Sequence, residues 1–157
     1  MDLAILRHGE ASAPAGRPDF ERTLTSVGRY QIAAAAQALR ERGGPTWRIV
    51  ASPAYRTRES TDIVCGVLSH PLDTVVWEPA VYNASLETLL DVVVEHSAEG
   101  NLLVVGHNPG VTYLMEYLCG AGSARRGLGT GSLARLSMPA RVWDQGSGTL
   151  AERFDPD

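Results

Sequence analysis

Short apolar segments alternate along this chain with longer segments of helical periodicity, and no other feature restricts its fold as strongly. Strands are predicted at residues 2–7, 47–51, 74–77, 102–105 and 133–138, with those at 2–7 and 102–105 buried, and a last edge strand is expected after Pro139. Strands that alternate with helices of about ten or more residues form a mostly parallel sheet with helices on both faces. We therefore expect an α/β fold built on such a sheet.

Residues that favour helix starts predict where the helices lie. The expected helices run from Thr25 to residues 43–45, from Ser52-Pro53 to about Leu68, from Ser85 to about Glu95, and onward from Asn108-Pro109. Ser, Thr and Asn are common N-caps, and Pro is common in the first turn of a helix. We expect Thr25, Ser85 and Asn108 as N-caps, with Pro53 and Pro109 in the first turns.

Length and charge exclude several classes of protein. The chain has 157 residues, 44% of them hydrophobic, and a net charge of −4, which fits one globular domain spanning residues 1–157. This charge argues against nucleic-acid binding by bulk electrostatics. No apolar run approaches the roughly 20 residues that cross a bilayer, and the N-terminus lacks a secretory signal pattern. We expect a cytoplasmic protein without a membrane partner, and the sequence leaves the oligomeric state open.

Cysteine and lysine usage restricts the chemistry further. Cys65 and Cys119 lie far apart in apolar helical contexts, which predicts buried thiols, and no metal-ligand spacing is present. The chain contains no Lys, which excludes Schiff-base and P-loop mechanisms. We expect neither a metal nor another cofactor.

Arginine and histidine residues follow three of the predicted strands. Arg7-His8 follows the first strand, Arg56 lies shortly after the second, and His107 follows the fourth. Ligands of open α/β sheets bind beyond the carboxyl ends of the strands, so these side chains should meet. Two guanidinium groups can hold a phosphate dianion while one imidazole attacks phosphorus and the other donates a hydrogen bond. Backbone N–H groups at the helix start near Asn108 would add to this anion site.

Each of these motifs alone is more often structural than functional, because short motifs match by chance. An isolated Arg56 is typical of a solvated helix surface, and Asn108-Pro109-Gly110 is typical of a turn. Their coincidence at three strand ends of one predicted sheet favours a phosphate-binding active site.

The sequence resembles the histidine phosphatase superfamily in a series of ordered blocks. These are R-H-G at residues 7–9, D-x-x-R-x-L-T-x-x-G at 19–28, S-P-x-x-R-T at 52–57, V-G-H-N-P-G at 105–110 and T-G-x-L-A at 130–134. The last block is similar to that of SixA-type phosphohistidine phosphatases, in the short bacterial branch. The resemblance extends from Leu3 to about Leu136.

This resemblance implies a phosphoglycerate-mutase-like, three-layer α/β/α sandwich and a role for each matching residue. His8 is the implied nucleophile, Arg7 and Arg56 the phosphate clamps, and His107 the second pocket histidine. Ser52 supports the pocket wall. The remaining candidates are Asn108, as a substrate-binding residue, and Arg22, either at the pocket rim or in a salt bridge with Glu21 or Asp19.

The kind of leaving group that this site can release indicates which class of substrate to expect. An alcohol leaving group benefits from a general acid, and the candidates Glu78 and Glu87 match no acid motif of the family. This favours phosphohistidine on a protein, whose imidazole leaving group needs less help. Residues 120–131, with Arg125 and Arg126, form either a docking loop for an acidic partner or an ordinary solvated loop.

Two alternatives remain open at the level of sequence. One is a phosphomonoesterase that acts on a small phosphate ester, such as a sugar or nucleotide phosphate. The other is a phosphate-recognition module without turnover, although such a module would not need the nucleophile His8.

Overall fold

Six strands form one sheet in the described part of the chain. The computed structural model describes residues 1–13, 15–42, 46–98, 100–120 and 126–156. The strands are β1 (Asp2–Arg7), β2 (Arg48–Ala51), β3 (Val76–Trp77), β4 (Leu102–Gly106), β5 (Leu133–Ser137) and β6 (Thr149–Phe154), in the spatial order β3-β2-β4-β1-β5-β6. The strands β3, β2, β4 and β1 are parallel, while β5 runs antiparallel to both β1 and β6.

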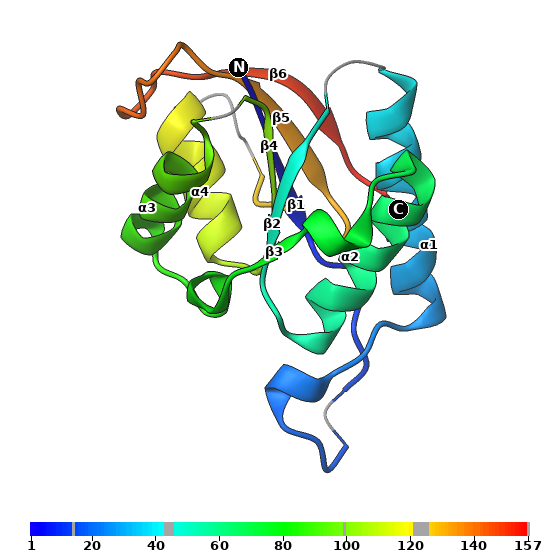
Figure 1. Cartoon of the computed structure of the whole chain (residues 1–157). Coiled ribbons are helices and arrows are strands. Elements are labelled where there is room, and N and C mark those ends of the chain that lie inside the picture. Colours follow the sequence, from blue (N-terminus) through cyan, green and yellow to red (C-terminus); the bar gives the residue numbers. More distant parts are fainter. Residues whose placement is uncertain (14, 43–45, 99, 121–125, 157) are drawn as a thin grey trace.

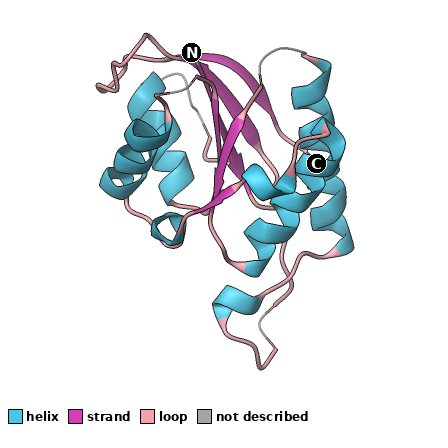
Figure 2. Cartoon of the chain, in the orientation of Figure 1, coloured by secondary structure: helices cyan, strands magenta, loops and turns pink. Residues whose placement is uncertain are grey.

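Helices cover both faces of the sheet, as Figures 1 and 2 show. On one face lie α1 (Ser26–Glu41) and α2 (Tyr55–Leu68), and on the other lie α3 (Leu86–His96) and α4 (Gly110–Cys119). Side chains of β1 alternate between the faces: Leu3 and Ile5 pack with α3 and α4, whereas Ala4 and Leu6 pack with α1 and α2. The predicted α/β/α sandwich is confirmed.

The predicted helix starts are right for α1 and α3 and wrong for α2 and α4. Thr25 Oγ1 accepts the Gly28 N–H, and Ser85 Oγ accepts the Thr88 N–H. The helix α2 begins at Tyr55, so Pro53 precedes it instead of occupying its first turn.

Asn108 is not the N-cap of α4. The helix begins at Gly110 after Pro109, and the Asn108-Pro109 peptide bond is cis. The Asn108 side chain donates to the Leu128 carbonyl at 2.7 Å and accepts from the Thr112 hydroxyl at 2.7 Å. Its amide therefore ties α4 to the segment before β5.

Smaller differences concern segment ends. Thr74 belongs to a 3₁₀ turn, Leu72–Thr74, so the third strand is shorter than predicted. The Gly-Gly-Pro at 43–45, predicted to end the first helix, lies outside the described residues, and α1 ends at Glu41. None of the helices in the described ranges is long and apolar enough to cross a membrane.

The sheet order brings three strand ends together. The strand β4 lies between β1 and β2, with Arg7 opposite Gly106 and Ala51 opposite Val105. The first residues beyond these three strands are His8, Ser52 and His107.

The loop after β1 lies directly against the start of α1. A Cβ atom added to Gly9 would overlap the Gly28 carbonyl, and one added to Gly28 would overlap the Glu10 carbonyl. The Gly9 N–H also donates to Ser60 Oγ of α2 at 3.2 Å. Only glycine permits this approach, which sets the position of the preceding His8.

Candidate active site

His8 is a buried, neutral imidazole with one nitrogen free to react. Its Nδ1 lies 2.7 Å from the Gly9 carbonyl, which can only accept, so the proton is on Nδ1 and Nε2 carries a lone pair. The residue is 7% exposed. Burial lowers its pKa to about 4, and the positive charges of Arg56, Arg7 and Arg22 act in the same direction.

His107 is oriented by Ser52. Its Nε2 lies 2.8 Å from Ser52 Oγ, which also accepts the Ala54 N–H at 3.2 Å. A hydroxyl that accepts from Ala54 can still either donate to Nε2 or accept from it, so the Ser52 contact is compatible with an imidazole proton on Nδ1 or on Nε2. In the described part of the chain this Nδ1 is buried without a partner. Burial, followed by the charges of His8 and Arg56, lowers the pKa of His107 to about 3.

Arg56 and Arg7 bring two positive charges to His8. The Arg56 side chain, from the first turn of α2, is 6% exposed, and its Nε–H points to His8 Nε2 at 3.4 Å. Arg7 donates through Nη1 to the Leu128 carbonyl at 3.1 Å, and its buried Nε finds no acceptor among the described residues. Burial and the nearby Arg56 charge lower the pKa of Arg7.

A pocket of about 360 Å³, here called the His8 pocket, opens beyond the carboxyl ends of the strands. Of the predicted residues, Arg7, His8, Arg22, Arg56, His107 and Asn108 line it. Ser52 is fully buried behind His107. Glu78 and Glu87 are not among the lining residues, whereas Glu10 and Asp19 are.

Arg22 lies at the pocket and also forms a salt bridge, and both were predicted from the sequence. It lines the pocket, and its Nη1 lies 3.1 Å from Asp19 Oδ1 while its Nε donates to the Ser12 carbonyl at 2.8 Å. The salt bridge thus involves Asp19, one of the two partners considered.

Two residues that matter to the pocket were missed as site residues. Asp19 Oδ2 accepts from Arg56 Nη2 at 3.0 Å and from the Tyr82 hydroxyl at 2.7 Å. The Tyr82 ring packs edge-on against His107 and Phe20, with centroids 5.4 Å and 5.2 Å apart. Asp19 stood in the 19–28 block, but there it predicted only a partner for Arg22. No motif pointed to Tyr82.

The loop at residues 120–131 is described only in part. Arg125 and its neighbours from 121 lie outside the described residues. Arg126 has a side chain that is 76% exposed and pairs with Asp155 at 3.4 Å. Its predicted docking role stays a prediction.

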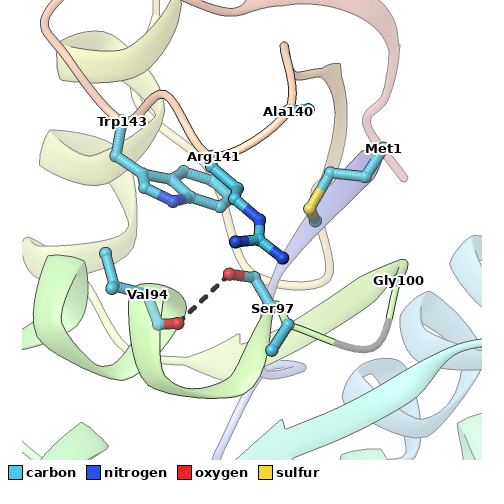
Figure 3. A pocket seen from close by; sticks show the side chains of 8 residues that line it. Met1, Val94, Ser97, Gly100, Ala140, Arg141 and Trp143 are labelled. Atoms are coloured by element: carbon cyan, nitrogen blue, oxygen red, sulfur yellow. Dashed lines mark hydrogen bonds between the residues drawn. The ribbon is translucent and has the colours of Figure 1, made fainter.

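A second cavity, of about 500 Å³, lies near the start of β1, at the other end of the sheet (Figure 3). Its polar lining side chains are Ser97 and Arg141, and the Ser97 hydroxyl donates to the Val94 carbonyl at 3.2 Å. Among the described residues that line it, no nucleophile is paired with a base, unlike in the His8 pocket. Within the described ranges, no group of three or more His, Cys, Asp or Glu residues could hold a metal ion.

The His8 pocket has the parts needed to handle a phosphoryl group. Nε2 of neutral His8 can attack phosphorus, two guanidinium groups can stabilise charge on the equatorial oxygens, and His107 can donate from Nδ1 when Ser52 donates to its Nε2. All of these groups are held in place by contacts within the protein before any ligand binds, which favours catalysis by positioning.

Comparisons with known proteins show which sequences and folds this chain is similar to. Residues 3–78 match the family model of the histidine phosphatase superfamily, branch 1. The fold is similar to that of SixA from Agrobacterium tumefaciens, with 26% identity and a TM-score of 0.84 over 99% of this chain and 97% of that one. SixA from Nakamurella multipartitia is 25% identical, with a TM-score of 0.78 over 99% and 95% of the two chains.

A third solved structure, the protein histidine phosphatase SixA in complex with tungstate, shares the fold at 24% identity. Its TM-score is 0.84 over 99% of this chain and 97% of that chain. No curated protein sequence matches this chain.

Proposed function

Because this chain belongs to the histidine phosphatase superfamily, we propose that it is a phosphatase that works through a phosphohistidine intermediate on His8. The observation that carries this proposal is the state of the His8 ring. The Gly9 carbonyl holds the proton on Nδ1, and Nε2 faces the guanidinium group of Arg56. In this proposal residues 1–157 act as one domain, since β1 and β6 share a sheet.

The reaction has two steps. His8 Nε2 attacks phosphorus in line, the P–Nε2 bond forms, and the bond to the leaving group breaks. Water then attacks the phosphoryl group of phosphohistidine, and Nε2 leaves as phosphate is released. Arg7, Arg56 and a hydrogen bond from His107 offset the negative charge in both transition states.

The proposed substrate is phosphohistidine on a protein. Asp19 lines the pocket, but hydrogen bonds from Tyr82, Arg22 and Arg56 hold its pKa well below the ordinary value. It is therefore ionised at neutral pH and has no proton to donate. Glu10 accepts a hydrogen bond from the Thr25 hydroxyl at 3.0 Å. A pocket in which Asp19 has no proton to donate suits an imidazole leaving group better than an alkoxide.

The test measures initial rates of phosphate release, in excess EDTA, from a phosphohistidine-bearing protein and from an alkyl phosphate ester, glycerol phosphate. We expect fast release from phosphohistidine, slow release from the ester, and loss of both with His8→Ala. His70→Ala is the matched control, because His70 bonds Thr74 outside the pocket, and it should keep the wild-type rate.

Other outcomes would change the proposal in defined ways. Faster cleavage of the ester than of phosphohistidine would point to a phosphomonoesterase acting on small phosphate esters. Phosphate release that survives His8→Ala would remove His8 as the nucleophile.

A further inference from the structure

We propose that Asp19 is a positioning residue for Arg56, because it binds one end of the guanidinium group and thereby turns the Nε–H edge toward the nucleophile His8. This inference rests on the proposed function for its kinetic test, but its geometry does not depend on the identity of the substrate.

The contacts of Arg56 divide its guanidinium group into two edges. Nη1 donates to the Asp19 carbonyl at 2.7 Å, and Nη2 donates to Asp19 Oδ2 at 3.0 Å. The two terminal nitrogens of the guanidinium group, Nη1 and Nη2, thus both bind Asp19. Nε–H lies on another edge and points to His8 Nε2 at 3.4 Å. A phosphoryl group on Nε2 would meet Nε–H and the remaining N–H of that edge.

Asp19 is itself held in place from two further directions. The Tyr82 hydroxyl donates to Oδ2 at 2.7 Å, and Arg22 Nη1 donates to Oδ1 at 3.1 Å. The Tyr82 contact joins the 3₁₀ turn Asp19–Glu21 to the segment after β3, and the Arg56 contacts join it to α2. Three donors on one carboxylate leave it few alternative orientations, which makes it a suitable support for Arg56.

Burial makes this support necessary. Arg56 is 5% exposed, and a buried guanidinium group must have partners because water cannot solvate it. In Asp19→Ala the carboxylate that accepts from Nη2 is lost, whereas the backbone carbonyl that accepts from Nη1 remains. The guanidinium group is then free to turn its Nη2 end toward the anion. A small misplacement of a catalytic group costs up to about a hundredfold in rate.

The experiment compares Asp19→Ala with the wild type in three measurements. Rapid-quench kinetics on phosphohistidine should show a kcat lower by about 10- to 100-fold, with a smaller change in KM. Urea denaturation should show that the variant is fully folded in the assay buffer. Asp19→Asn, which keeps a side-chain oxygen, should restore part of the rate. Calorimetric titration with tungstate should show weaker binding.

A double-mutant cycle separates positioning from general support of the loop. If Asp19 acts through Arg56, then Asp19→Ala has little further effect on rate or tungstate affinity in the Arg56→Ala protein. Asp155→Ala is the matched control, because Asp155 also pairs with two arginines, Arg126 and Arg153, but does not line the His8 pocket. It should behave as the wild type.

An unchanged kcat and tungstate affinity in Asp19→Ala would overturn the proposal, and so would an equal loss with and without Arg56. If wild-type phosphate release does not depend on His8, the proposed function fails, and the tungstate cycle still tests Asp19 by itself.

Discussion

Acidification from pH 7 to pH 4 should destabilise the fold through His8. The unfolded chain binds a proton at His8 near pH 6.5, but burial in the folded protein lowers the pKa to about 4. Between these values the unfolded state binds more protons than the folded state, so the free energy of unfolding falls as the pH falls. A tenfold change in proton affinity corresponds to about 1.4 kcal/mol, which gives a loss of about 3 kcal/mol for His8.

Urea denaturation followed by tryptophan fluorescence at pH 7, 6, 5 and 4 would measure this loss in the wild type and in His8→Asn. We expect the wild type to lose about 3 kcal/mol more than the variant over this range. The acidic side chains contribute to both proteins and largely cancel in the difference. Removal of His8 also removes one of the charges that lower the pKa of His107, which changes the difference in the same direction.

Parallel stability curves for the two proteins would refute the reasoning, because they would mean that His8 takes up its proton equally well in the folded state. The variant His96→Asn, whose ring does not line the pocket, controls for the substitution itself and should follow the wild-type curve.

Three further substitutions test the site and its support. Ser52→Ala removes the hydrogen-bond partner that orients the His107 ring through Nε2, so kcat should fall by about tenfold or more in the phosphohistidine assay. Arg7→Ala should lower kcat by about 10²- to 10³-fold without shifting the urea midpoint, and an unchanged rate would remove Arg7 from the mechanism. Gly28→Ala should cost more than about 2 kcal/mol of stability in urea denaturation, because its Cβ would overlap the loop after β1. Gly66→Ala, with open space around its Cβ, should instead stabilise α2 by about 0.5–1 kcal/mol; equal effects would contradict this account.

The parts of the site that follow strands directly were predictable from the sequence. Arg7, His8 and His107 lie at or just beyond the ends of β1 and β4, where both the apolar pattern and the sheet rule place them. Arg56, in the first turn of α2, follows from the same logic. Their meeting in space required only that β1, β2 and β4 be neighbours.

The outer part of the site was not predictable, because its contacts join residues far apart in sequence. Asp19 bonds Arg56 over 37 positions and Tyr82 over 63. Neither hydrophobic periodicity nor capping preferences in a sequence can predict contacts between residues so far apart. Asn108 shows a related effect, since its intrinsic preference for an N-cap gives way to bonds with Leu128 and Thr112.

The inner side of the His8 pocket, formed by His8 and His107, and its mouth, formed by the turn Asp19–Glu21, differ in how deeply they are buried in the folded protein. The strands behind His8 and His107 are almost entirely buried, so their amide hydrogens should exchange with solvent only on global unfolding. The turn Asp19–Glu21 buries none of its residues and is joined to Arg56 and Tyr82 by hydrogen bonds. Because of this division, substitutions at the mouth can change which leaving groups enter while the nucleophile and its fold stay intact.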